Sequence, residues 1–241
     1  AMSSDASPAV RMAVVLVQRR LQDVRVAKLL DDADPLVRTE AARAIHDLPL
    51  DTLLPQLAAT LPKLIAKPIA DSDALARRAI NANYRLGDAE HAKAVLAAVS
   101  CPTLSTAVRS EALAALRDWA NPPPRDRVTG FWRVEKPRDA SIVRGVVEDG
   151  LEALLTNTTG RLQTDAVGLL VSVGAKADET RFVSLANDAK ADPNLRVAAM
   201  RFLAGRKSKD ADTVLVAALK STSPVVRAEA RELIAKSDPV R

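Results

Sequence analysis

The feature that most constrains the fold is a short helical motif that returns along the whole chain. The clearest copies read SPAVRMAVVLV, DPLVRTEAARAI, DPNLRVAAMRFL and SPVVRAEARELI. Including weaker versions, copies begin at Ser7, Asp34, Asp73, Thr106, Gly160, Asp192 and Ser223. Recurrence at a roughly fixed interval is the sequence signature of repeat architectures. The chain is therefore predicted to consist of about seven similar units.

Each part of the motif has a physical reason. An Asp or Ser before Pro is a typical N-cap followed by proline at the first helical position, where a missing N–H does no harm. The Val, Ala and Leu or Ile that follow form one apolar stripe at helical spacing. The small residue three positions after the motif's arginine lets neighbouring helices approach closely. The motif therefore predicts a capped helix that packs on other helices.

A second amphipathic run follows most copies, for example VRVAKLLDD, LLPQLAATLPKLI, AEHAKAVLAAV and IVRGVVEDGLEALL. Two helices repeated every 30–40 residues or so are typical of helical solenoids. We therefore predict an all-α, right-handed α-solenoid of about seven helical pairs, with 1–241 as one domain.

Composition agrees with close helix packing. Hydrophobic residues make up 48% of the chain, aromatic residues only 2%, and there are eight glycines. A core of Leu, Val, Ile and Ala suits helices, and alternating β-type segments are few. The opening AMSSDASP, with Ala before Met, suggests a segment of a longer protein.

One arginine occupies the same motif position in six copies, and Gln163 replaces it in the fifth. This arginine column consists of Arg11, Arg38, Arg77, Arg109, Arg196 and Arg227. The motif resembles the short HEAT repeats with a DPxVRxxAAxAL core, and the resemblance covers nearly the whole chain. In HEAT families the recurring arginine joins a ladder of Asp–Arg contacts in the turns, which implies a structural role here.

The resemblance also implies partners for the column. Arg38 with Asp34 and Arg196 with Asp192 fit the ladder. Acidic residues two positions after the column are expected to pair with the arginine of the next repeat; they are Glu40, Glu111, Asp165 and Glu229.

The fourth repeat is interrupted by a stretch unlike its surroundings. The interval from Arg109 to Gln163 is too long by about half a repeat, and the excess is WANPPPRDRVTGFWRVEKPRD. Three prolines impose an extended conformation, Thr129-Gly130 predicts a turn, and Asp139 is a plausible cap for the next helix. We therefore expect a Pro/Arg/aromatic inserted loop over 121–139, between the two helices of the fourth repeat.

Two interpretations of this loop stay open. Either Phe131 and Trp132 fold back to plug the helices, with the arginines solvated or paired with Glu135 and Asp139, or the loop docks on a partner. The two coexist if one aromatic anchors the loop while another is presented. Trp and Arg are common interface anchors, and long insertions in repeat proteins often form binding surfaces. The candidate docking residues are Arg125, Arg127, Phe131, Trp132 and Arg133.

A closer resemblance rests on WANPP and GFWR, within about Asp34 to Asp139. This stretch is similar to the HEAT segment of large secreted bacterial proteins described as membrane-bound sugar or sorbosone-type dehydrogenases, in which a β-propeller precedes the repeats and a c-type cytochrome follows. The resemblance implies an extracytoplasmic spacer between two modules. This chain carries neither Cys-x-x-Cys-His nor propeller sequence, so the activity it implies would lie outside these residues.

Sequence motifs for catalysis are missing. His46 and His91 have no metal-ligand spacing, and neither a phosphate loop, a dinucleotide fingerprint nor a nucleophile elbow occurs. Cys101 suits an inert thiol, and His46 suits a helix C-terminus. We expect no catalytic residue, no cofactor, no metal and no membrane insertion.

Three function classes remain. The first is a non-catalytic interaction scaffold or interdomain spacer whose partner is a protein or an adjacent domain of the same chain. The second is a nucleic-acid-binding protein similar to HEAT-like DNA glycosylases, which the modest net charge of +5 and the mixed charges of the second helices disfavour. The third is a HEAT-type lyase, which no specific residue in the sequence supports.

Overall fold

The computed structural model describes residues 2–48 and 50–237, and the described residues form helices and no β-sheet. The chain divides into two compact units, Ala1–Val146 and Val147–Arg241. The division falls inside α8 (Ala140–Asp149). Because the described residues form helices and no β-sheet, the predicted all-α class is confirmed. A single domain and a right-handed solenoid stay predictions.

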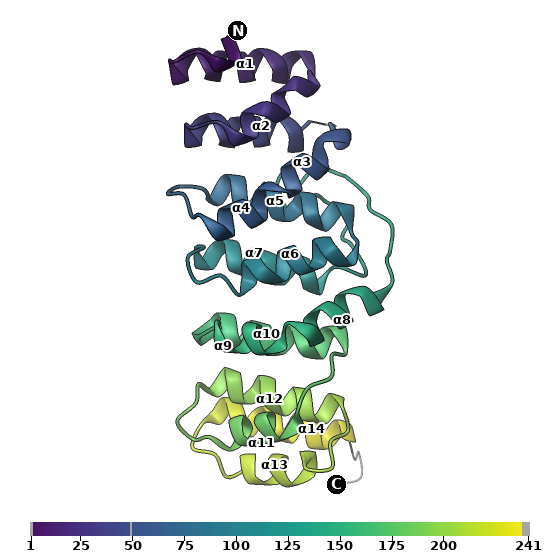
Figure 1. The fold of residues 1–241 in the computed structure, drawn as a ribbon. Coiled ribbons are helices and arrows are strands. Elements are labelled where there is room, and N and C mark those ends of the chain that lie inside the picture. The colour runs from purple at the N-terminus through teal and green to yellow at the C-terminus, as the bar shows by residue number, and fades with distance from the viewer. Residues whose placement is uncertain (1, 49, 238–241) are drawn as a thin grey trace. The chain divides into compact units, whose positions relative to one another are not determined.

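The first unit contains four motif helices that contact one another in chain order (Figure 1). They are α1 (Pro8–Leu21), α2 (Pro35–His46), α5 (Asp73–Leu86) and α7 (Thr106–Arg117). The helices that alternate with them are η2 (Val24–Asp31), α3 (Leu54–Ala58), α4 (Thr60–Ala66) and α6 (Ala89–Val99), with short 3-10 turns η1 (Met2–Ser4) and η3 (Asp51–Leu53). The repeat interval therefore corresponds to one helix-turn-helix unit.

The second unit repeats this order. Its motif helices are α10 (Gly160–Val173), α12 (Pro193–Gly205) and α14 (Pro224–Ser237), and the alternating helices are α9 (Leu151–Thr156), α11 (Glu179–Asn187) and α13 (Ala211–Ala218). Helix α12 packs against α10, α11, α13 and α14.

Helix starts follow the capping pattern. Asp34 Oδ1 accepts hydrogen bonds from the N–H groups of Leu36 and Val37, at 2.8 and 3.1 Å, and Pro35 is the first helical residue. Asp192 caps α12 in the same way. These contacts satisfy N–H groups that have no partner inside the helix.

The core is aliphatic, as the composition predicts. Motif alanines such as Ala41, Ala112 and Ala199 are fully buried, so adjacent helices approach closely. Phe182 and Phe202 stack at 4.0 Å between ring centroids in the second unit.

The alternating helices are less regular than predicted. VRVAKLLD forms the 3-10 helix η2, LLPQLAATLPKLI divides into α3 and α4, and IVRGVVEDGLEALL is interrupted at Gly150 between α8 and α9. An internal proline or glycine is the physical reason in the two interrupted segments.

The arginine column is structural at most of its positions, but through other contacts than the resemblance implies. Arg109 Nε donates to Val99 O at 2.7 Å and Arg196 Nε to Ala186 O at 3.0 Å, each a carbonyl at the end of the preceding helix. Arg11 binds Asp32 with two hydrogen bonds, and Arg227 donates to backbone carbonyls of the turn before its helix. The expected pairs of Arg38 with Asp34 and of Arg196 with Asp192 are wrong, because both aspartates cap their helices.

Arg77 is a second correction. Helix α5 is preceded by Ser72 as its N-cap residue, so the column position four residues on belongs to Ala76, which is fully buried. Arg77 is exposed, and its neighbour Arg78 binds Asp47 with two hydrogen bonds.

The acidic positions pair, but not with column arginines of the next repeat. Glu40 binds Arg19 of the preceding motif helix, and Glu229 likewise binds Arg201. Glu111 binds Arg127 of the insertion, and Asp165 binds Arg161 one turn earlier.

Candidate functional site

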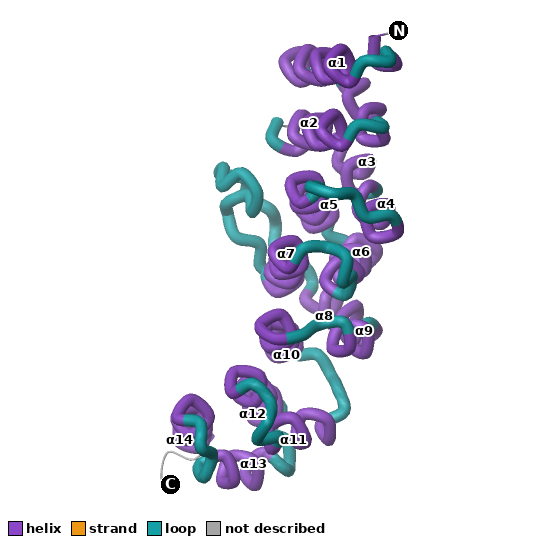
Figure 2. The backbone as a smooth tube through the Cα atoms, turned by 90° about the vertical axis from the view of Figure 1, so that its left-hand side faces the viewer, coloured by secondary structure: helices purple, strands orange, loops and turns teal. Residues whose placement is uncertain are grey.

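The insertion 121–139 folds as an ordered hairpin attached to the first unit; we call it the insertion hairpin. It leaves the end of α7, runs back along the first unit and returns to α8 (Figure 1), and it stands out as a loop beside α5 and α7 in Figure 2. Asp139 caps α8 as predicted, with Oδ1 accepting from Ser141 N at 2.8 Å.

The base of the hairpin is built around two aromatic rings. Trp119 is fully buried and packs edge-on against Tyr84 of α5, with centroids 5.5 Å apart. The guanidinium of Arg138 lies over both rings, 4.9 Å from Tyr84 and 5.4 Å from Trp119. Arg138 N also donates to Ala120 O at 2.8 Å, so the two strands of the hairpin are joined where they leave the helices.

The turn of the hairpin is organised by Asp126. Its Oδ1 accepts hydrogen bonds from Val128 N, Thr129 N and Thr129 Oγ1 at 2.8–3.0 Å. Gly130 has φ of 72°, a left-handed conformation that side chains disfavour. Asp126 N donates to Phe131 O, which closes the turn.

The hairpin is anchored on α2 through buried polar groups. Arg133 NH1 donates to His46 O at 3.0 Å, a contact between residues 87 positions apart. Asp126 Oδ2 lies 3.5 Å from His46 Nε2 and 3.6 Å from Arg133 NH1. His46 is fully buried, and its ring nitrogens also contact Asp47 and Asn81.

Asp126 is held in its charged form. Burial raises the pKa of this carboxyl. The hydrogen bonds from Thr129 and Val128 and the electrostatic effect of His46 lower it by a larger amount, so the pKa lies below its ordinary value of 3.8. The carboxylate is therefore an internal counter-charge for the hairpin.

Three further ion pairs hold the two arms of the hairpin. Arg127 binds Glu111 in the middle of α7 and Asp118 at its C-terminal end, and its side chain is only 12% exposed. Glu135 binds Arg85 of α5 at 2.9 Å. Both arms of the hairpin are thus tied to helices, which restricts the motion of the segment between them.

The end of the hairpin is apolar and exposed. Phe131, Trp132 and Val134 are 63%, 69% and 65% exposed. Arg125, opposite Trp132 in the antiparallel bridge, places its guanidinium 5.9 Å from the indole centroid. We call these four residues the hairpin tip.

The five predicted docking residues therefore separate into two groups. Arg125, Phe131 and Trp132 lie together at the exposed tip, where Arg125 NH1 donates to Gly130 O at 3.1 Å, whereas Arg127 and Arg133 bind groups on the helices. Phe131 and Trp132 do not plug the helices, so that interpretation is wrong.

Sequence reasoning missed Val134, Asp126 and the partners on the helices. The DRVTG sequence contains the Asp and Gly of the turn and could have identified Asp126 as its organiser. His46 is the last residue of α2 as predicted, but its burial under the hairpin had no signal in the sequence.

Other candidate chemistry does not assemble. No group of three His, Cys, Asp or Glu residues that could hold a metal ion occurs in the described part of the chain. His91 contacts Asp88 and lies apart from His46, and Cys101 is buried with Sγ 3.0 Å from Thr103 Oγ1. Among the described residues, no helix has the length and hydropathy needed to span a bilayer.

Comparisons with known proteins add little. No protein-family model and no curated protein matches the chain. A crystal structure of an engineered protein, solved by a structural genomics consortium, is 22% identical, covers 88% of this chain and 96% of its own, and has a TM-score of 0.47. Neither its identity nor its TM-score is high enough to support an argument about function.

Proposed function

We propose that the chain is a non-catalytic protein-interaction module of HEAT-type helical repeats, in which the insertion hairpin docks on a partner protein or an adjacent domain. The observation that carries the proposal is the hairpin tip. Its three apolar side chains are exposed to water, although polar contacts with the helices hold the segment that bears them. The helices, on this view, form a right-handed solenoid that supports the hairpin.

Exposure of these side chains has an energetic cost that docking would recover. Burying a Phe, Trp or Val on a partner is worth about 1.5–3 kcal/mol for each side chain. Isolated exposed apolar residues are normal on proteins, but adjacent large aromatics beside an arginine resemble interface hot spots. A partner with an apolar pocket and a neighbouring acidic group would suit this tip.

Order in the free state also favours docking. Immobilising a flexible loop costs free energy on binding, whereas this hairpin is already fixed by Asp126, Arg127, Arg133 and Glu135. In the proposal, those four residues hold the hairpin in place, and the residues of the hairpin tip contact the partner.

The dehydrogenase resemblance supports a proposal for the parent protein. We place the chain as a spacer in an extracytoplasmic multidomain oxidoreductase, with the hairpin facing a neighbouring domain or a separate protein. The modest net charge of +5 disfavours a nucleic-acid partner.

Photocrosslinking tests the docking proposal. A benzoylphenylalanine at position 131 or 132 of the full-length protein should give a specific crosslink in its native host, and the same group at Leu16, an exposed apolar position on α1, should not. Equal crosslinking from position 16, or none from either tip position, would contradict the proposal.

A further inference from the structure

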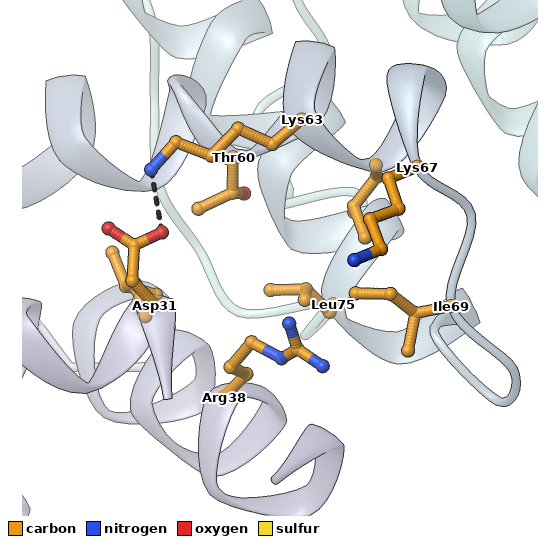
Figure 3. A pocket seen from close by; sticks show the side chains of 9 residues that line it. Asp31, Arg38, Thr60, Lys63, Lys67, Ile69 and Leu75 are labelled. Atoms are coloured by element: carbon orange, nitrogen blue, oxygen red, sulfur yellow. Dashed lines mark hydrogen bonds and ion pairs between the residues drawn. The ribbon is translucent and has the colours of Figure 1, made fainter. Parts of the chain in front are cut away.

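A pocket between α2, α4 and α5 in the first unit contains a cation that the fold does not use. It is partly open to solvent and has a volume of about 130 Å³, and its apolar lining includes Leu30, Leu64 and Leu75. Leu75 lies beside Arg38 in Figure 3. Arg38 of α2 and Lys67, just after α4, extend their charged groups into the same space. The pocket is distant in sequence from the insertion hairpin and contains none of its residues.

Arg38 differs from the other members of its column. Its Nε is buried and has no hydrogen-bond partner among the described residues. Arg109 and Arg196, at the same helical position, donate from Nε to a carbonyl ten residues earlier. The residue ten positions before Arg38 is Lys28, inside the 3-10 helix η2, and no hydrogen bond joins the two among the described residues. The irregular helix thus leaves this guanidinium free to serve the pocket.

The acidic groups nearby are already engaged. Asp31, the carboxylate of the pocket lining, binds Lys63 at 2.6 Å, as the dashed line in Figure 3 shows. Asp32 is within electrostatic range of Arg38, but both its oxygens bind Arg11. The pocket lining holds three cations (Arg38, Lys63, Lys67) and one carboxylate, so a net charge of +2 faces an apolar floor.

We infer that this pocket binds a small organic monocarboxylate, with the carboxylate between Arg38 and Lys67 and a short apolar chain against Leu64 and Leu75. An arginine fork matches the planar geometry of a carboxylate. A cavity of about 150 Å³ holds a benzene molecule, so 130 Å³ suits a ligand of about six non-hydrogen atoms. Butyrate has that size, and its carboxylate would meet the guanidinium end of Arg38, which faces the pocket.

Chemical-shift titration of the ¹⁵N-labelled chain with butyrate tests the inference. Butyrate should shift the amide signals around Leu30, Arg38, Leu64 and Leu75. The neutral isostere butyramide should bind at least about tenfold more weakly, because it loses a charge-assisted hydrogen bond. Inorganic phosphate should also bind at least about tenfold more weakly, because it lacks the apolar chain. Arg38→Met should lose a similar factor. Arg117→Met, an exposed arginine on α7, is the matched control and should bind as wild type does.

A stability measurement separates a ligand-binding arginine from a structural one. Without butyrate, Arg38→Met should unfold at the wild-type temperature or above it, because it removes an unpaired buried donor. Lys67→Met should also weaken butyrate binding, and it gives the answer if Arg38→Met fails to fold.

Four results would overturn the inference: no shifts at the pocket, equal binding of butyramide, equal binding of phosphate, or unchanged binding in Lys67→Met. Trp132→Ala should retain butyrate binding, so this test is independent of the proposed docking function.

Discussion

Single residues of the insertion have opposite roles although they share a chemical type. The chain has two tryptophans, of which Trp119 is fully buried against Tyr84 and Trp132 is 69% exposed. Arg127 and Arg133 bind acidic or carbonyl groups on the helices, whereas Arg125 lies beside Trp132 at the tip and donates to Gly130 O within the hairpin itself. Residue type predicts which side chains can anchor an interface, and only contacts decide which of them are free to do so.

The two tryptophans should respond differently to truncation. Trp119→Ala should lower the free energy of unfolding by about 3–5 kcal/mol, the cost of losing a buried aromatic side chain. Trp132→Ala should change it by less than about 0.5 kcal/mol, as for other exposed positions. Urea unfolding followed by circular dichroism measures both, and a large loss in Trp132→Ala would mean that the tip is a structural element.

Asp126 should make stability depend on pH. Its folded-state pKa lies below 3.8, so its contribution is fully present above the unfolded pKa and is lost as the pH falls through the folded pKa. Wild type should therefore be more stable than Asp126→Asn at pH 6, and the difference should shrink below about pH 4. A stability difference that grows as the pH falls below that value would contradict this assignment.

At the scale of elements, the sequence predicts what local physics controls. Pro35 and Asp34 indicate the start of α2, and Asp139 indicates the start of α8. The sequence does not decide the register of α5, because Ser72 and Asp73 are both good caps. An alignment that starts from Asp73 places Arg77 in the column, one residue after the position that Ala76 occupies. The contact of Arg133 with His46 could not be predicted, since it joins residues 87 positions apart and depends on the path of the whole hairpin.

The hairpin turn should be sensitive to glycine replacement. Gly130 has φ of 72°, so Gly130→Ala should cost about 1–2 kcal/mol of local stability although no atom lies within 4 Å of the added Cβ. Gly145, within α8 and equally free of neighbours, is the control, and Gly145→Ala should be neutral or stabilising by up to about 1 kcal/mol. Amide hydrogen exchange at Val128 and Gly130 should accelerate in Gly130→Ala alone.

For the whole molecule, the repeat pattern predicts helix pairs throughout, and both units consist of them. The pattern could not predict the division between the units inside α8, the interruption at Gly150 or the 3-10 form of η2, because interrupted apolar spacing is compatible with one helix or two. The position of the candidate site, over 121–139, could be predicted, whereas the sequence left the exposure of its aromatics open, and its anchors depend on tertiary contacts.

The proposed solenoid has a measurable consequence for size. A compact chain of this length should have a radius of gyration of about 18 Å. A solenoid of stacked pairs is elongated, so small-angle scattering of the monomer should give a clearly larger value. A result near 18 Å would contradict the solenoid proposal and leave the helical class intact.

The central claim is that the hairpin presents its tip to solvent while its base is buried, and tryptophan fluorescence tests it most directly. Trp119→Phe leaves Trp132 as the only indole, and Trp132→Phe leaves Trp119. The Trp119→Phe variant should emit like a hydrated indole and be quenched readily by acrylamide, whereas the Trp132→Phe variant should emit at shorter wavelength and resist quenching. Protected emission from Trp132 in the monomeric protein would show that the tip packs on its own chain and would contradict the docking account.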